Sequence, residues 1–249
     1  MKPENLIVSR ADKKIYKSGD KLIKLFDANY SKANILNEAL NHARVEETAL
    51  NVPKIRSIEV VEGKWAIVLD YIEGDTLQSL MNKHPEKEDE YLNLFVDLQM
   101  TVLSQKVPML NKLKDKMQAK ISATNLDAST RYDLHTRLDA MPKHTNLCHG
   151  DFNPTNIIIT SDGTPYIIDW SHATQGNSSA DVARSYLLFY LAGKKELGDK
   201  YLRLYCKKSD TAIQYVQRWI PIVAASRLVK APESEAEFLH SWIDVVDYE

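Results

Sequence analysis

Short apolar runs separated by turn residues fill residues 5–71 of the chain. Runs of this length, with glycine, proline or aspartate between them, are typical of β-strands and hairpins. One longer segment interrupts them, and its apolar residues recur at the three- and four-residue spacing of a helix. The pattern predicts a helix at 32–49 and strands at 6–8, 14–17, 21–26, 55–61 and 65–71.

Helical spacing of apolar residues dominates the chain after Thr76. The expected helices are 77–84, 86–106, 109–122, 130–141, 178–191, 195–207, 210–229 and 232–247, and Pro221 is expected to kink the one that contains it. The lysines of 109–122 are expected to form a solvated face. Two short apolar strands, 157–159 and 166–168, interrupt the helices and flank a turn at 161–163.

Polar residues that can carry chemistry flank this short hairpin. Asp151 and Asn156 precede it, five residues apart, and Asp169 follows its second strand. Phosphoryl transfer uses one carboxylate to accept the proton of the attacking hydroxyl, and a second carboxylate with an amide oxygen to bind Mg²⁺. Loop Asp and Asn residues also serve as plain turn residues. The order and spacing of the three residues favour the catalytic interpretation.

The segment His-Gly-Asp-Phe-Asn-Pro-Thr-Asn at 149–156, followed by Ile-Ile-Asp-Trp at 167–170, resembles the aminoglycoside phosphotransferase and choline kinase family of the protein-kinase-like fold. The resemblance implies a bilobal α/β (α+β) fold, with an antiparallel β N-lobe at 1–72 and a mostly helical C-lobe at 73–249. It implies transfer of the γ-phosphate of ATP or GTP to a hydroxyl of a small molecule such as an aminoglycoside, choline or a sugar-like metabolite. Asp151 would be the catalytic base, and Asn156 and Asp169 would bind Mg²⁺.

The resemblance also assigns roles in the N-terminal part. Lys24 shares a strand face with apolar neighbours, and it resembles the lysine that pairs with the α- and β-phosphates; Lys21 is a competitor for this role. Glu38 resembles the helix glutamate that holds this lysine, with Glu46 and Glu47 as alternatives.

Residues 69–74 resemble the hinge between the lobes, where Asp70 and Ile72 would bind the nucleotide base through their main chain. The loop 9–13 contains no glycine, which departs from the protein-kinase pattern. Ser9 and Arg10 are weak candidates for phosphate contacts in that loop.

We predict roles for three further residues near the motif. His149 is expected to brace the loop, Asn153 to contact acceptor or phosphate, and Asp181 to have a structural role at a helix N-terminus. The last helices are rich in acidic residues, and an acidic wall there would favour a cationic acceptor. An exposed charged helix face is the simpler interpretation.

Composition narrows the class of protein. A net charge of −2 gives no sign of a nucleic-acid partner, and no apolar stretch is long enough to span a bilayer. Two cysteines are too few for a disulfide scaffold. Together these features favour a cytoplasmic protein. The glycine-free loop supports one alternative, a catalytically inactive kinase-like nucleotide-binding module. The absence of His-Arg-Asp and Asp-Phe-Gly argues against a protein kinase.

Overall fold

The structure is a computed structural model that describes residues 5–10 and 12–243. The chain forms two compact units, which are described one at a time. Unit 1 comprises Met1–Glu86 and Pro154–Ala173, and unit 2 comprises Lys87–Asn153 and Thr174–Glu249. The short hairpin therefore groups with the N-terminal sheet. The predicted lobe boundary at residue 72 stays a prediction.

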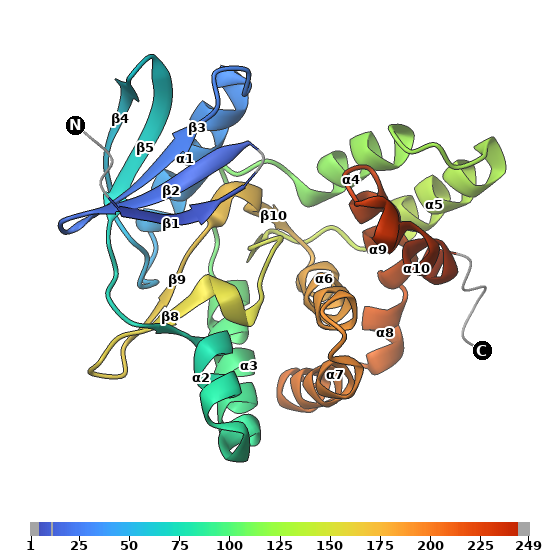
Figure 1. Cartoon of the computed structure of the whole chain (residues 1–249). Coiled ribbons are helices and arrows are strands. Elements are labelled where there is room, and N and C mark those ends of the chain that lie inside the picture. Colours follow the sequence, from blue (N-terminus) through green and yellow to red (C-terminus); the bar gives the residue numbers. More distant parts are fainter. Residues whose placement is uncertain (1–4, 11, 244–249) are drawn as a thin grey trace. The chain divides into compact units, whose positions relative to one another are not determined.

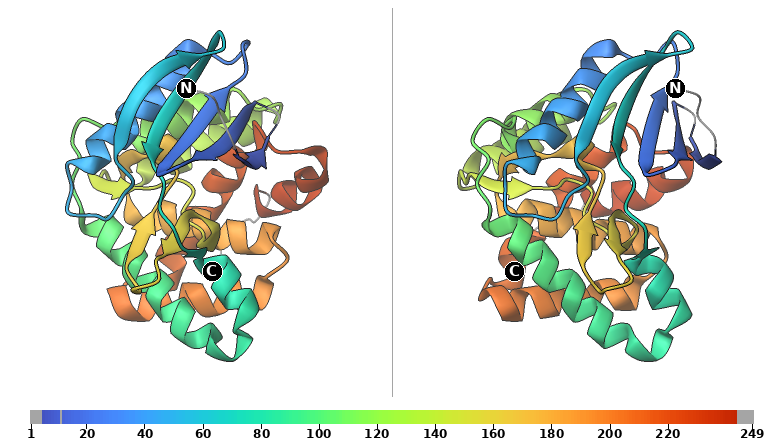
Figure 2. Two further views of the ribbon diagram at one scale, coloured as in Figure 1. Left: turned by 60° about the vertical axis from the view of Figure 1, so that its left-hand side comes forward. Right: turned by 90° about the vertical axis from the view of Figure 1, so that its left-hand side faces the viewer.

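Unit 1 holds a five-stranded antiparallel sheet in the order β1-β2-β3-β5-β4. Its strands are β1 (Asn5–Ser9), β2 (Lys13–Ser18), β3 (Lys21–Phe26), β4 (Ile55–Val61) and β5 (Lys64–Asp70). Helix α1 (Lys32–Glu46) packs against this sheet (Figure 1). Figure 2 shows the sheet from two further sides, with β4 and β5 as its longest pair. The predicted antiparallel sheet and first helix are confirmed.

The two faces of β3 belong to different apolar clusters. Ile23 and Leu25 pack with residues of β4 and β5 on one face. Phe26 packs on the other face with residues of α1 and β5, and Leu22 joins it there. Because side chains alternate along a strand, Lys24 lies on the same face as Leu22 and Phe26. The alternation of β3 therefore turns the lysine toward α1.

A second, smaller sheet of unit 1 contains the hairpin. Its order is β6-β8-β9, with β6 (Asp75–Thr76), β8 (Ile157–Ile159) and β9 (Pro165–Ile167). The 3₁₀ turns Pro154–Asn156 and Trp170–His172 flank the hairpin, and α2 (Leu77–Lys83) follows β6. Any side chain at Gly74 would collide with the chain, because its Cβ would lie 2.3 Å from the carbonyl oxygen of Ile159. A glycine is required where these strands meet.

Unit 2 is mostly helical. Its helices are α3 (Glu88–Ser104), α4 (Leu113–Ser122), α5 (Ala128–Ala140), α6 (Ser178–Leu191), α7 (Lys195–Ser209), α8 (Ile213–Gln217), α9 (Ile220–Leu228) and α10 (Glu233–Ile243). Strands β7 (Asn146–Cys148) and β10 (Thr174–Gly176) pair antiparallel. Aromatic side chains of α3, α6 and α7 form the core around Phe95. No helix in the described ranges is long and apolar enough to cross a bilayer. The cytoplasmic location stays a prediction.

The structure corrects two predicted helices and tests a third only in part. The expected kinked helix 210–229 is two helices, α8 and α9, and Pro221 lies in the first turn of α9. Proline suits that place because a first-turn N–H has no partner within the helix. The helix expected at 109–122 begins only at Leu113, since Lys112 forms a β-bridge with Gln175. Helix α10 begins at Glu233, and the predicted extension to 247 lies outside the described residues.

Candidate active site

Three predicted residues meet in unit 1. The Nζ atom of Lys24 lies 2.8 Å from Oε1 of Glu38 and 3.2 Å from Oδ1 of Asp169. Lys13 also approaches Glu38, at 3.5 Å. Lys24 is only 7% exposed. Strand β3, helix α1 and the end of the hairpin thus hold one ammonium group in a fixed place.

The alternatives to Glu38 are used elsewhere or exposed. The carboxylate of Glu46 accepts the backbone N–H of Ile55 at 2.8 Å, which ties α1 to the start of β4. Glu47 is exposed after the end of α1. Of the three candidates, Glu38 alone is paired with Lys24 in the described part of the chain.

The environment keeps Lys24 charged. Burial alone would lower the pKa of Lys24, but the negative charges of Asp169 and Glu38 outweigh it and raise that pKa above its ordinary value. A lysine held in this way presents a permanent positive charge at neutral pH. Such a charge suits the recognition of phosphate oxygens.

Asp169 has an uncommon backbone conformation. Its φ of 63° and ψ of 61° lie in the left-handed region, which Asp and Asn tolerate better than other side chains. The next residue, Trp170, is fully buried, and its indole N–H donates to the carbonyl oxygen of Ile167 at 3.0 Å. The buried tryptophan and the left-handed turn direct the Asp169 carboxylate toward Lys24.

Asn156 and Asp169 lie at the same, open end of the hairpin, Asn156 just before β8 and Asp169 shortly after β9. The backbone carbonyl of Asn156 accepts the N–H of Ile168 at 2.9 Å, which joins the two chain segments at this end. The Asn156 side chain is buried, and both it and Asp169 line one cavity. An amide oxygen and a carboxylate are the hard oxygen ligands that Mg²⁺ prefers, so the residues present fit this ion.

The cavity in unit 1 has a volume of about 410 Å³. Apolar side chains of β2, β3, β5 and the hairpin form much of its wall, while Lys24, Asn156 and Asp169 supply polar groups. The predicted hinge residues Asp70 and Ile72 also line it. Within the described residues, the backbone N–H of Ile72 makes no hydrogen bond. A volume of this size is typical of small-molecule sites.

Arg10 and His42 also line the cavity of unit 1. Arg10 of the glycine-free loop lines it, whereas Ser9 does not. His42 of α1 was not identified from the sequence, because no motif contains it. Its Nε2 atom lies 2.5 Å from the carbonyl oxygen of Pro53, and burial lowers its pKa. A neutral His42 can therefore anchor the segment that leads into β4.

The loop around Asp151 lies in unit 2 and is held from several directions. The backbone N–H of Asp151 donates to Nδ1 of the fully buried His149 at 3.2 Å. Gly150 has a φ of 78°, and its N–H donates to Oδ1 of Asp181 at 2.6 Å. Asn153 donates to the carbonyl oxygen of Asp151 at 2.9 Å. These contacts give His149 and Asp181 the bracing geometry that the sequence predicts.

Arg184 of α6 is a second residue that the sequence analysis missed. Its guanidinium lies 3.8 Å from Oδ1 of Asp151, and its side chain is 16% exposed. Arg184 follows Asp181 by one helical turn, so both side chains face the same loop. This spacing is a signal that could have identified it once Asp181 was recognised.

The acidic residues of α10 do not form one wall in the described structure. Both Glu233 and Glu237 are exposed, and Glu235 is bound by the guanidinium of Arg227 at 2.8 and 2.9 Å. Glu233 and Glu237 therefore belong to an exposed charged helix face, the simpler of the two interpretations of the sequence. Asp244 lies outside the described residues.

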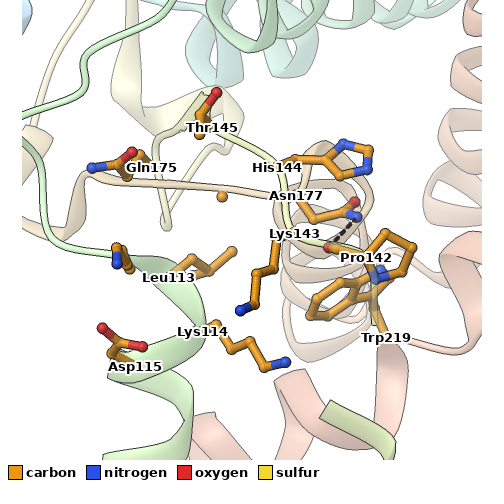
Figure 3. Close-up of a pocket in the computed structure, with 12 residues that line it drawn as sticks. Leu113, Lys114, Asp115, Pro142, Lys143, His144, Thr145, Gln175, Asn177 and Trp219 are labelled. Atoms are coloured by element: carbon orange, nitrogen blue, oxygen red, sulfur yellow. Dashed lines mark hydrogen bonds between the residues drawn. The ribbon is translucent and has the colours of Figure 1, made fainter. Parts of the chain in front are cut away.

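A second cavity, of about 230 Å³, lies within unit 2 (Figure 3). It is lined by the start of α4, by residues 142–145 and by Trp219, and it contains neither Asp151 nor Arg184. Asn177 donates to the carbonyl oxygen of Pro142 at 3.4 Å on its rim. Within the described ranges, the buried indole N–H of Trp219 has no hydrogen-bond partner.

Replacement of Glu38 tests the ion pair. We expect Glu38→Ala to lower the free energy of unfolding by about 3 kcal/mol, because it leaves the buried Lys24 with one carboxylate fewer. Chemical denaturation would measure this loss. Glu47→Ala, an exposed glutamate at the end of the same helix, is the control and should change stability little. Equal effects of the two substitutions would contradict the assignment.

Comparisons with known proteins agree with this geometry. No curated protein sequence matches the chain. Among solved structures, a thermostable mutant of aminoglycoside phosphotransferase APH(4)-Ia, in ternary complex with ADP and hygromycin B, is 13% identical with a TM-score of 0.71, covering 96% of this chain and 91% of that one. Choline kinase LicA from Streptococcus pneumoniae is 15% identical with a TM-score of 0.61, covering 97% and 91%. The predicted α/β fold, with an antiparallel N-terminal sheet and a helical C-terminal part, is confirmed.

The family comparison covers most of the chain. The family model described as "Phosphotransferase enzyme family" matches residues 13–219. This range contains the ion pair, the hairpin and the loop around Asp151. The match shows that the chain belongs to the phosphotransferase enzyme family and confirms the phosphotransferase activity predicted from its motifs.

Proposed function

We propose that this chain transfers the γ-phosphate of ATP or GTP to a hydroxyl of a small molecule, in a reaction that needs Mg²⁺. The observation that carries the proposal is the Lys24, Glu38 and Asp169 cluster at the cavity of unit 1. A positive group and oxygen ligands at one cavity are what binding of a magnesium nucleotide requires. Solved structures of the same fold include complexes with ADP and AMP-PNP.

The residues of unit 1 would bind the nucleotide. Lys24 would donate to the α- and β-phosphates, with Glu38 holding its ammonium group in place. The main chain of Asp70 and Ile72 would bond the edge of the base, while apolar cavity walls cover its faces. Catalysis of this kind rests on positioning and on electrostatic stabilisation more than on covalent chemistry.

The metal ligands would be Asn156 and Asp169. When bound, Mg²⁺ supplies positive charge against the phosphate oxygens. The two residues supply one amide oxygen and one carboxylate, and waters complete the shell of this ion in most proteins. The role of the hairpin would be to hold these two groups on adjacent strands at its open end.

Asp151 would act on the acceptor. Its carboxylate would accept the proton of the attacking hydroxyl, or orient that hydroxyl for attack. The hydrogen bonds of Asp151 with His149 and Asn153 restrict the loop that carries it. Acceptors such as an aminoglycoside, choline or a sugar-like metabolite all carry the required hydroxyl.

The glycine-free loop supports a second candidate, a nucleotide-binding module without transferase activity. Such a module has no use for a base, whereas this chain retains Asp151 together with Asn156 and Asp169. We therefore favour the enzyme.

Thermal unfolding with nucleotides tests the proposal. We expect Mg-ATP or Mg-GTP to raise the melting temperature, because a ligand at about 100 times its Kd stabilises the native state by about 2.7 kcal/mol. The rise should require Mg²⁺ and vanish with a chelator. The absence of any rise at millimolar nucleotide would overturn the proposal. A rise without ADP formation, across a panel of hydroxyl compounds, would favour the binding module.

A further inference from the structure

Basic side chains from three helices of unit 2, and from the turn that follows α9, lie near one another. The basic cluster is defined here as Lys116, Lys120, Arg184, Arg227 and Lys230. Helix α9 packs against both α4 and α6, which brings these side chains together. Lys116 and Lys120 are four residues apart on α4, and therefore neighbours on its surface. Both are partly buried, which corrects the fully solvated lysine face expected from the sequence.

The lysines of this cluster are in an unfavourable environment. Burial, followed by the charges of Arg184 and Lys230, lowers the pKa of Lys116 to about 8. Burial and the neighbouring charges, Lys116 first, lower the pKa of Lys120 to about 7. Two like charges at this helical spacing destabilise a helix, and partial removal from water adds to the cost. An anion bound beside Lys120 would offset both penalties for this lysine.

The carboxylates near the cluster are each engaged. Asp181 is buried and accepts the N–H of Gly150. Glu235 takes two guanidinium N–H groups of Arg227. Asp151 lies 3.8 Å from Arg184. In the described part of the chain, Lys120, Arg184, Arg227 and Lys230 thus face three carboxylates, and the surplus charge of these four cations is positive.

The cluster is continuous with the candidate base. The guanidinium of Arg184 lies 3.8 Å from Asp151, and the negative charge of Asp151 favours the charged forms of both Arg184 and Arg227. A molecule whose hydroxyl lies at Asp151 would therefore extend toward these cations. Arginine forks and lysine ammonium groups recognise phosphate and carboxylate oxygens.

We propose that the phosphate acceptor of this enzyme carries an anionic group, a phosphate or a carboxylate, which binds the basic cluster while its hydroxyl lies at Asp151. The proposal rests on the proposed function, since it names the acceptor class of the same reaction. Arg184 and Arg227 would bind the anionic group on the side of Asp151, and Lys120 on the side of α4. An amine on the acceptor would meet repulsion at this position.

Inorganic phosphate tests the cluster without any need for turnover. We expect phosphate to raise the melting temperature of the wild type above that in sodium chloride of equal ionic strength. Lys120→Gln should weaken phosphate binding about tenfold, because it removes one charged hydrogen bond. The control is Lys207→Gln, an exposed lysine near the end of α7, which should bind phosphate as the wild type does. Equal binding by both variants means an adventitious ion only and overturns the proposal.

Residues 244–249 carry three carboxylates in the sequence and provide a further control. Repeating the phosphate titration on a chain that ends at Ile243 tests whether these carboxylates, and not a bound anion, neutralise the basic cluster. Phosphate that binds only after their removal would overturn the proposal. Unchanged or tighter binding, with the full chain also binding phosphate, supports it.

Matched acceptors test the link to catalysis. Glucosamine, glucose, glucuronate and glucose 6-phosphate share one ring and differ in charge. With Mg-ATP, we expect kcat/KM for the anionic members to exceed that for the others by at least about tenfold, and Lys120→Gln to remove the advantage through KM. Preference for glucosamine or glucose would overturn the proposal while leaving the proposed function intact. If Mg-ATP stabilises the protein but none of the four compounds is phosphorylated, the phosphate titration alone decides whether the basic cluster binds an anion.

Discussion

An Asp151→Asn enzyme is expected to turn over its acceptor at least about 10²-fold more slowly than the wild type, which is the usual range for loss of a general base. Asparagine keeps the size of the side chain but cannot accept the hydroxyl proton. The loop should keep its shape, because the backbone N–H of Asp151 still donates to His149 and its carbonyl oxygen still accepts from Asn153. Steady-state kinetics with the identified acceptor would measure the loss.

Nucleotide binding separates this role from a structural one. Mg-ATP should stabilise Asp151→Asn as much as the wild type, because Lys24 and the metal ligands are unchanged. Asp89→Asn is a matched control, since its side chain is 86% exposed in the first turn of α3. Turnover of Asp151→Asn equal to that of Asp89→Asn would refute the role of Asp151. Loss of nucleotide stabilisation as well would mean that the substitution disturbs the fold.

The N-terminal part of the site was accessible from the sequence because its determinants are local. Strand alternation alone places Lys24 on the face of β3 that carries Leu22 and Phe26. That face is the one covered by α1, and Glu38 lies among the buried residues of α1. The period-2 pattern thus predicts the face of β3 on which Lys24 lies, whereas Glu38 as its partner is what the resemblance to the kinase-like family implies.

Other features depend on tertiary contacts that no local pattern reports. The bond of His42 with Pro53 arises from the path of the chain after α1. Arg184 was not identified from the sequence, because its contact with Asp151 depends on the position of the Asp151 loop beside α6. The basic cluster joins α4, α6 and α9, and along the sequence its lysines look like an ordinary solvated run. Partial burial lowers the pKa values of Lys116 and Lys120, and the sequence pattern did not indicate that these lysines are partly buried.

The left-handed conformation of Asp169 was equally invisible in the sequence, and it determines how this residue should be tested. Alanine in that conformation costs about 1–2 kcal/mol of strain, which would mix a backbone effect with the loss of the carboxylate. Asparagine tolerates the same conformation. Asp169→Asn therefore removes one negative charge from the cluster and leaves the turn intact.

We expect Asp169→Asn to lower kcat by about 10²–10³-fold, the range measured when one preorganised electrostatic contact is lost from an active site. The rise in melting temperature that Mg-ATP causes should also disappear, because a neutral amide replaces the charged oxygen ligand. Titration of Mg²⁺ at fixed ATP, followed by thermal unfolding and by ADP formation, measures both effects. Lys24 keeps Glu38 as its partner, so the protein should still fold.

Asp210 offers a control with the same backbone feature. Its φ is 52°, also left-handed, and it lies exposed at the end of α7 in unit 2. Asp210→Asn makes the same chemical change in the same conformation, in the unit that contains neither the hairpin nor Lys24. It should leave kcat and the magnesium dependence unchanged. If Asp169→Asn behaves like Asp210→Asn, Asp169 does not bind the metal, and Asn156 loses its proposed partner.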